Sequence, residues 1–201
     1  MIRFVSYISG TVLFFASYSA FAAGEDPKLK LGLRLGYAVA EGDIVKDVNA
    51  RKFATGQVPI GVDAGYLVTP HILVGLYGQY GIVQPGEFCL QCTGRDLRFG
   101  VQGQYHMLPQ AAVDPWFGLG TGYETLTFSN ASGDYTVRGF EFLNLQGGAD
   151  FKLARAMSMG PFLSATLSEY SHEAYANHDG AIGGKALHTW LTLGVRGTLG
   201  L

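Results

Sequence analysis

Charge is scarce in this sequence. Lys, Arg, Asp and Glu make up 15% of the 201 residues, against about 25% in an average soluble domain. The formal net charge is only −2, so the chain has no basic surface of the kind that binds nucleic acid. The length fits one domain, and the composition is unusual for a soluble enzyme.

Long apolar runs are absent beyond the start of the chain. Arg3 precedes a predominantly apolar segment from Phe4 to Phe15, and Ala20-Phe21-Ala22 places small residues before a cleavage site. This order predicts a secretory signal peptide over residues 1–22 and a mature domain over residues 23–201. The apolar segment is too short to be a membrane-spanning helix.

Cysteine is limited to Cys89 and Cys92. A thioredoxin motif would need a βαβ context, and a structural zinc site would need two further ligands at suitable spacing. Neither is present, so we expect no metal and no cofactor here. Because an exported chain meets an oxidising compartment, we expect a local disulfide between the two residues.

Helical periodicity is nearly absent, and alternation of apolar and small or polar residues takes its place. From Leu29 to Val39, large apolar residues occupy odd positions while Lys, Gly, Arg and Ala occupy even ones. Alternation with period two predicts β-strands. Around Phe142 and Leu143 the phase of the alternation changes, which indicates either a β-bulge or a strand that starts later. The expected strands cover residues 29–39, 58–66, 72–83, 96–108, 115–128, 137–153, 157–170 and 187–201.

The connections between these strands alternate in length. Short turns centre on 69–71, 109–114 and 154–156. The long connections cover residues 41–57, 84–95, 129–136 and 171–186. In an antiparallel meander all long loops fall at one end and all short turns at the other, as in outer-membrane barrels.

The two strand faces indicate which side meets lipid. The apolar face runs unbroken for about ten residues per strand, the length of a tilted transmembrane strand. The other face is mostly Gly, Ser, Thr and Gln, which suits the crowded interior of a narrow barrel. We therefore predict an all-β fold, an eight-stranded antiparallel up-and-down transmembrane β-barrel.

The mature sequence resembles the small eight-stranded outer-membrane barrels of Gram-negative bacteria, of the OmpA/OmpX type. Pro115-Trp-Phe-Gly-Leu-Gly-Thr-Gly-Tyr123 is similar to a segment of porin-family barrels where a strand leaves a periplasmic turn. The resemblance implies location in the outer membrane, contact with its lipid and lipopolysaccharide, insertion by the barrel-assembly machinery, and a monomer. Such proteins usually end in an aromatic residue, whereas this chain ends in Leu201, which implies a weaker assembly signal.

Charges on the inward face should be paired, because an unpaired buried charge costs several kcal/mol. Arg34, Asp63 and Arg196 fall at similar heights on the first, second and last strands, which become neighbours when the barrel closes. We predict an ionic cluster of these three residues in a plugged lumen. Other charges on the inward face would extend it: Arg98, Glu124, Asp150, Lys152 and Lys30.

Aromatic residues on the apolar face are expected to form two belts at the membrane interfaces. The belt towards the outer end would contain Tyr37, Tyr80, Phe99 and Tyr123. The belt towards the periplasmic end would contain Tyr66, Tyr105, Phe117 and Phe151.

The leading functional hypothesis is a non-enzymatic barrel whose long loops serve adhesion, ligand contact or envelope stabilisation. A narrow channel for small solutes is an alternative. A lipid A-modifying enzyme is a further alternative, based on Ser171 and His172 near a strand end. The residues His172, Glu173, His178 and Asp179 could in principle bind a divalent cation, but flexible loop residues are weak evidence for a metal site.

Overall fold

The computed structural model describes residues 27–45, 48–87, 91–131, 133–176 and 178–201. The expected signal peptide over residues 1–22 lies outside these residues and stays a prediction. Cys89 also lies outside them, so the disulfide with Cys92 stays a prediction as well.

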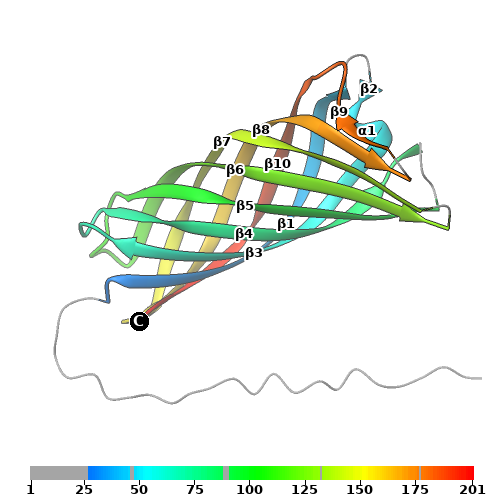
Figure 1. The fold of residues 1–201 in the computed structure, drawn as a ribbon. Helices are drawn as coiled ribbons and strands as arrows, with labels where there is room; N and C mark the ends of the chain where they lie inside the picture. The colour runs from blue at the N-terminus through cyan, green and yellow to red at the C-terminus, as the bar shows by residue number, and fades with distance from the viewer. Residues whose placement is uncertain (1–26, 46–47, 88–90, 132, 177) are drawn as a thin grey trace, which may run out of the picture.

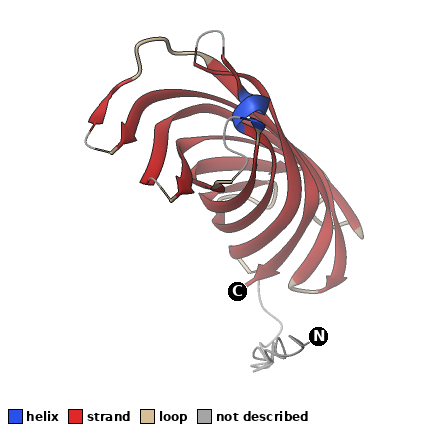
Figure 2. Ribbon diagram, turned by 90° about the vertical axis from the view of Figure 1, so that its right-hand side faces the viewer, coloured by secondary structure: helices blue, strands red, loops and turns tan. Residues whose placement is uncertain are grey.

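Eight long antiparallel strands form the molecule (Figure 1). They are β1 (Leu29–Val45), β3 (Ala54–Leu67), β4 (Ile72–Pro85), β5 (Thr93–His106), β6 (Val113–Asn130), β7 (Gly133–Ala154), β8 (Met157–Tyr175) and β10 (Leu187–Gly200). Each pairs with its neighbours in sequence order, and β10 pairs with both β1 and β8, which closes the sheet. The predicted eight-stranded antiparallel barrel is therefore confirmed, and Figure 2 shows the strands curving around the lumen.

Two of the long connections contain secondary structure. The segment expected to be a loop over residues 41–57 contains the end of β1, the short strand β2 (Val48–Asn49), helix α1 (Ala50–Phe53) and the start of β3. The segment 171–186 contains the end of β8 and strand β9 (His178–Ala181), which pairs with it. The strands therefore end later than the sequence pattern indicated, because they continue past the apolar band as paired hairpins.

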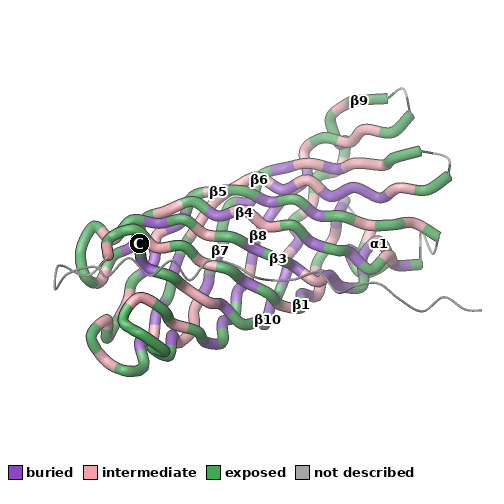
Figure 3. The backbone as a smooth tube through the Cα atoms, turned by 90° about the horizontal axis from the view of Figure 1, so that it is seen from below, coloured by how far each residue is buried: buried purple, intermediate pink, exposed green. Residues whose placement is uncertain are grey.

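Burial alternates along the strands (Figure 3). On β1 the large apolar side chains point outward, and Leu33 is 60% exposed while Arg34 is 5% exposed. The exposed apolar side chains continue around the whole barrel on every long strand. Water cannot favourably solvate an apolar surface of this extent, so this band faces the hydrocarbon of a bilayer.

The bulge expected near Phe142 and Leu143 is present. The pairing of β7 with β8 shifts between Glu141 and Leu143. Both Phe142 and Leu143 are exposed, and Glu141 is fully buried. The extra residue therefore keeps the apolar side chains outward while it turns a carboxylate into the lumen.

No helix among the described residues is long and apolar enough to cross a bilayer.

Candidate functional site in the barrel lumen

The lumen near the short turns contains one group of paired charges, the inner charged layer. Its charged residues are Arg34, Asp63, Asp150 and Arg196, and its amides are Gln102, Gln104 and Gln146. Arg34 donates to Asp63 at 2.8 Å from Nη2 to Oδ1. Gln146 connects the two sides of the lumen, because it accepts from Arg34 at 3.4 Å and donates to Gln102 at 2.8 Å.

Within this layer Arg196 pairs with Asp150, and Arg34 pairs with Asp63. Arg34 and Arg196 lie directly opposite each other in the pairing of β1 with β10. The two guanidinium groups bind different carboxylates. Arg196 binds Asp150 through two hydrogen bonds of 3.2 and 2.7 Å. A guanidinium matches a carboxylate in this two-bond geometry. The Arg196 guanidinium carbon also lies 3.6 Å from the ring centre of Trp116.

A second group of charges, the outer charged layer, surrounds Arg98 farther from the short turns. Arg98 donates to Asp96 at 2.8 Å and to Glu124 at 3.1 Å, and its Nη1 lies 3.6 Å from an oxygen of Glu141. The side chains of all three acids are 0% exposed, and that of Arg98 is 3% exposed. One guanidinium therefore lies within reach of three buried acidic side chains.

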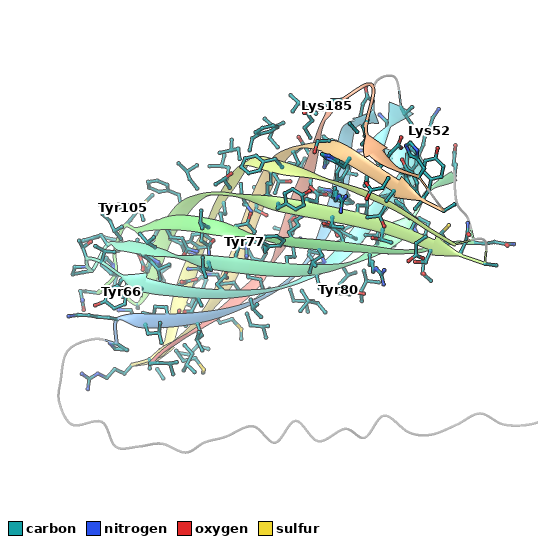
Figure 4. All side chains as sticks on the ribbon, in the orientation of Figure 1. Lys52, Tyr66, Tyr77, Tyr80, Tyr105 and Lys185 are labelled. Carbon is teal, nitrogen blue, oxygen red and sulfur yellow. The ribbon has the colours of Figure 1, made fainter. Side chains whose placement is uncertain are left out.

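Further hydrogen-bonding side chains complete the outer charged layer. Glu124 accepts hydrogen bonds from Tyr170 and from the Trp190 indole, and it lies 3.1 Å from His188 Nε2. Tyr77 donates to Glu141 at 2.6 Å, and Figure 4 shows Tyr77 labelled among the strands that surround the lumen. Donors of this kind replace the water that each carboxylate loses on burial.

Glycine makes room for Tyr77 to reach Glu141. A Cβ atom at Gly100 would lie 2.6 Å from the Tyr77 hydroxyl oxygen, and one at Gly122 would lie 2.4 Å from it. Both distances are far below van der Waals contact. Gly100 on β5 and Gly122 on β6 are therefore required by the Tyr77 side chain that crosses the lumen.

Apolar residues close the outer end of the lumen above these charges and form the apolar cap. The cap consists of Ala38, Ala40, Ile44, Ala50, Ala54, Val83, Leu126, Phe128, Val137, Tyr170, Ile182 and Trp190. Helix α1 contributes Ala50, and Phe53 packs against the cluster from the same helix. Tyr170 and Trp190 belong to both the cap and the outer charged layer, so apolar packing directly covers the Glu124 hydrogen bonds.

Sequence reasoning placed Arg34, Asp63, Arg98, Glu124, Asp150 and Arg196 on the inward face, and all six lie inside the barrel. It missed Asp96, Glu141 and His188 as members of the outer charged layer. The bulge was the available signal for Glu141, since the change of phase reverses the side on which this residue lies. Lys30 and Lys152 lie nearer the short turns and line a cavity there.

Seven of the eight aromatic residues assigned to belts are exposed on the barrel wall, and Tyr123 is half-buried. Tyr66 and Tyr105 lie towards the end with the short turns, and Tyr80 lies on the outside farther along (Figure 4). Neighbouring rings make contact, with centroid distances of 6.0 Å between Phe99 and Tyr123 and 5.5 Å between Tyr105 and Phe117. Their assignment to bilayer interfaces stays a prediction.

Beyond the apolar band, the outer ends of β7, β8 and β9 carry paired polar groups. Arg138 donates to Asp179 at 3.1 Å, and Tyr135 donates to Glu173 at 3.0 Å. Burial, with Glu173 beside it, raises the pKa of the Tyr135 hydroxyl above its usual value. Among the described residues no group of three His, Cys, Asp or Glu side chains could hold a metal ion.

Ser171 and His172 form a contact of 3.1 Å between Oγ and Nδ1, at a register shift in the pairing of β7 with β8. Both residues lie at the outer rim. Within the described part of the chain, no carboxylate hydrogen-bonds to the second ring nitrogen of His172, so the pair lacks the third, orienting group of a catalytic triad.

Comparisons with known proteins agree with this architecture. No protein-family model and no curated protein matches the sequence. The crystal structure of Neisserial surface protein A superposes with a TM-score of 0.59 and 11% identity, over 86% of this chain and 97% of that one. The solid-state NMR structure of the outer membrane protein AlkL in lipid bilayers superposes with a TM-score of 0.53 and 14% identity, over 94% of this chain and 98% of that one.

At these sequence identities the likeness concerns the fold. The physical reason for a location in a membrane is the apolar band on the outside of this barrel. A closed barrel satisfies every backbone hydrogen bond within a bilayer, and barrels with this pattern of short turns and longer outer hairpins span outer membranes. The chain has the fold of the small eight-stranded outer-membrane β-barrels and is a protein of the outer membrane.

Proposed function

We propose that this protein is a non-conducting, non-enzymatic barrel that presents its outer hairpins to the cell exterior, for adhesion, ligand contact or envelope stabilisation. The observation that carries the proposal is the filled lumen. Two charged layers and an apolar cap occupy successive levels of the interior. An ion that moved along the barrel would have to break the Arg34, Arg98 and Arg196 pairs, whose groups are buried.

The length of the strands supports the proposal that the outer hairpins contact other molecules. Strands β6, β7 and β8 have 18, 22 and 19 residues, whereas about ten suffice to span a bilayer. The surplus length forms paired hairpins, and exposed salt bridges such as Arg95–Asp134 and Arg138–Asp179 lie between their strands. An ordered surface of this kind is suited to contact with other molecules, and the similar Neisserial protein is itself described as a surface protein.

The enzymatic alternative has less support. Ser171 and His172 are in contact, yet His172 is exposed and the pair lacks an orienting carboxylate. A serine nucleophile needs a base whose orientation is fixed by a third group. We therefore place the function in the barrel and its outer surface rather than in this pair.

Conductance measurements test the filled lumen. We expect purified, folded protein in a planar lipid bilayer to give no steady ion current, while a general porin inserted under the same conditions gives large, stable steps. Steady current that scales with the number of inserted molecules would contradict the proposal and would support the channel alternative.

A further inference from the structure

The end of the barrel with the short turns contains a cavity of about 340 Å³, which we call the vestibule. Residues of all three short turns line it, including Thr69, Pro109 and Arg155. Its deepest residues belong to the inner charged layer, among them Asp63, Asp150 and Arg196. In outer-membrane barrels the short turns face the periplasm, so the vestibule is on the periplasmic side.

Positive charge predominates in the lining. Five cationic side chains line the vestibule: Lys28, Lys30, Lys152, Arg155 and Arg196. Three carboxylates accompany them: Asp63, Asp114 and Asp150. Wherever a cavity with low-dielectric walls carries an excess of one sign, it concentrates ions of the opposite sign.

Each of the three carboxylates is bound within the protein. Asp63 accepts from Arg34 and Gln102, at 2.8 and 2.9 Å. Asp150 is bound by Arg196. Asp114 lies 2.7 Å from His106 Nδ1 and accepts the Leu108 amide at 2.9 Å. Because these oxygens are engaged with the wall and floor, their charge opposes an incoming anion less than three free carboxylates would.

The cations include residues near the mouth of the vestibule. Lys152 donates to the carbonyl oxygen of Pro109 at 2.6 Å, so its ammonium group extends from β7 to the turn between β5 and β6. An ammonium has three donors, and this bond uses one of them. Lys30 lies on the same inward face of β1 as Arg34.

We propose that the vestibule binds a small multivalent oxyanion, with phosphate or carboxylate groups, from the periplasm. Its volume lies at the lower end of the range of about 300–1,000 Å³ in which small-molecule sites fall, so it suits a compact anion. The site is separate from the outer surface, and the inference holds whether or not the outer hairpins bind a partner.

Calorimetric titration of the full, folded chain in a neutral detergent tests the inference. Pyrophosphate and tricarballylate are the two probes, each titrated at an ionic strength of about 0.15 M so that long-range attraction is screened. The test variant combines Lys30→Gln, Lys152→Gln and Arg155→Gln. The matched control combines Arg51→Gln, Arg95→Gln and Lys185→Gln, which removes the same charge from exposed positions at the other end of the barrel.

We expect the unmodified protein to bind at least one probe. The vestibule variant should bind this probe at least about tenfold more weakly. The control variant should bind it with unchanged affinity, because charge attraction weakens steeply with distance in salt. A preference for pyrophosphate would identify phosphate as the ligand group, and a preference for tricarballylate would identify carboxylate. Absence of binding in the unmodified protein, or equal weakening in both variants, would overturn the inference. Heat-modifiable migration on gels establishes beforehand that each variant is folded.

Discussion

The two charged layers of the lumen differ in how they are isolated from water. The outer charged layer lies beneath the apolar cap, and its four ionic side chains are at most 3% exposed. The inner charged layer borders the vestibule, and the exposed fraction of its ionic side chains reaches 11% at Asp63. The outer layer has one arginine for three carboxylates, whereas the inner layer has two arginines for two carboxylates.

This difference shows where the barrel depends on a single residue. In the inner charged layer each arginine has its own carboxylate partner. Water in the vestibule can solvate a charge that loses this partner. In the outer layer all the acids share Arg98, and the cap prevents water from replacing it. The strength of electrostatic interactions and the penalty for an unpaired charge both increase as water is excluded.

The largest expected effect is that of Arg98→Leu. Removal of one partner from a buried ionic group costs about 3–5 kcal/mol, and here three carboxylates lose their common partner. We expect the variant to lose this much free energy of unfolding, measured by urea titration of barrels refolded in lipid vesicles. Arg98→Lys, which keeps the positive charge, should recover part of the loss. Equal stability of Arg98→Leu and the unmodified protein would show that the outer layer is wetter than its burial indicates.

Leu126→Ala should have a somewhat smaller effect, because it opens the cap without touching a charge. Leu126 is fully buried, and such truncations cost about 2–5 kcal/mol through lost burial and the cavity that remains. The same urea titration measures it. If the cap isolates the outer layer, Leu126→Ala combined with Arg98→Leu should destabilise less than the sum of the two single changes. If the two losses of unfolding free energy simply add in the double variant, the cap does not isolate the outer charged layer from water.

Arg196→Leu should be the mildest of the three. The change leaves Asp150 without its guanidinium, but this carboxylate lines the vestibule, where water can reach it. The cost should approach that of one unsatisfied polar group, about 1–3 kcal/mol. Urea titration of Arg196→Leu beside Arg98→Leu compares the two losses of unfolding free energy directly. Equal losses would show that the two charged layers do not differ in their isolation from water.

Strand number, topology and the direction of side chains were predictable from the sequence, because period-two alternation assigns each residue to one face. Arg34, Asp63 and Arg98 were placed in the lumen for this reason. Strand ends were less predictable. The residues beyond Val39 on β1 and beyond Tyr170 on β8 lack strict alternation, yet they continue as strand because pairing with β2 and β9 satisfies their backbone groups.

The partners within the lumen were not predictable, since they depend on register and on side-chain reach across the barrel. Arg34 and Arg196 fall opposite each other, as their similar heights predicted, yet the sequence pattern does not show that Arg196 binds Asp150 on β7. Arg98 meets Glu141 only because the bulge at Phe142 turns that carboxylate inward. Local sequence pattern contains no information on distances between strands that are far apart in the chain.

The links across the lumen have a consequence for how the barrel can assemble. Arg34 and its acceptor Gln146 are 112 residues apart in the sequence, and Arg196 and Gln104 are 92 apart. Such contacts form late, because the chain must first close large loops. Until β10 joins β1, an unclosed sheet would carry arginines and carboxylates that still need water, so it cannot enter hydrocarbon one strand at a time. Closure and insertion must therefore be coupled into a single cooperative event.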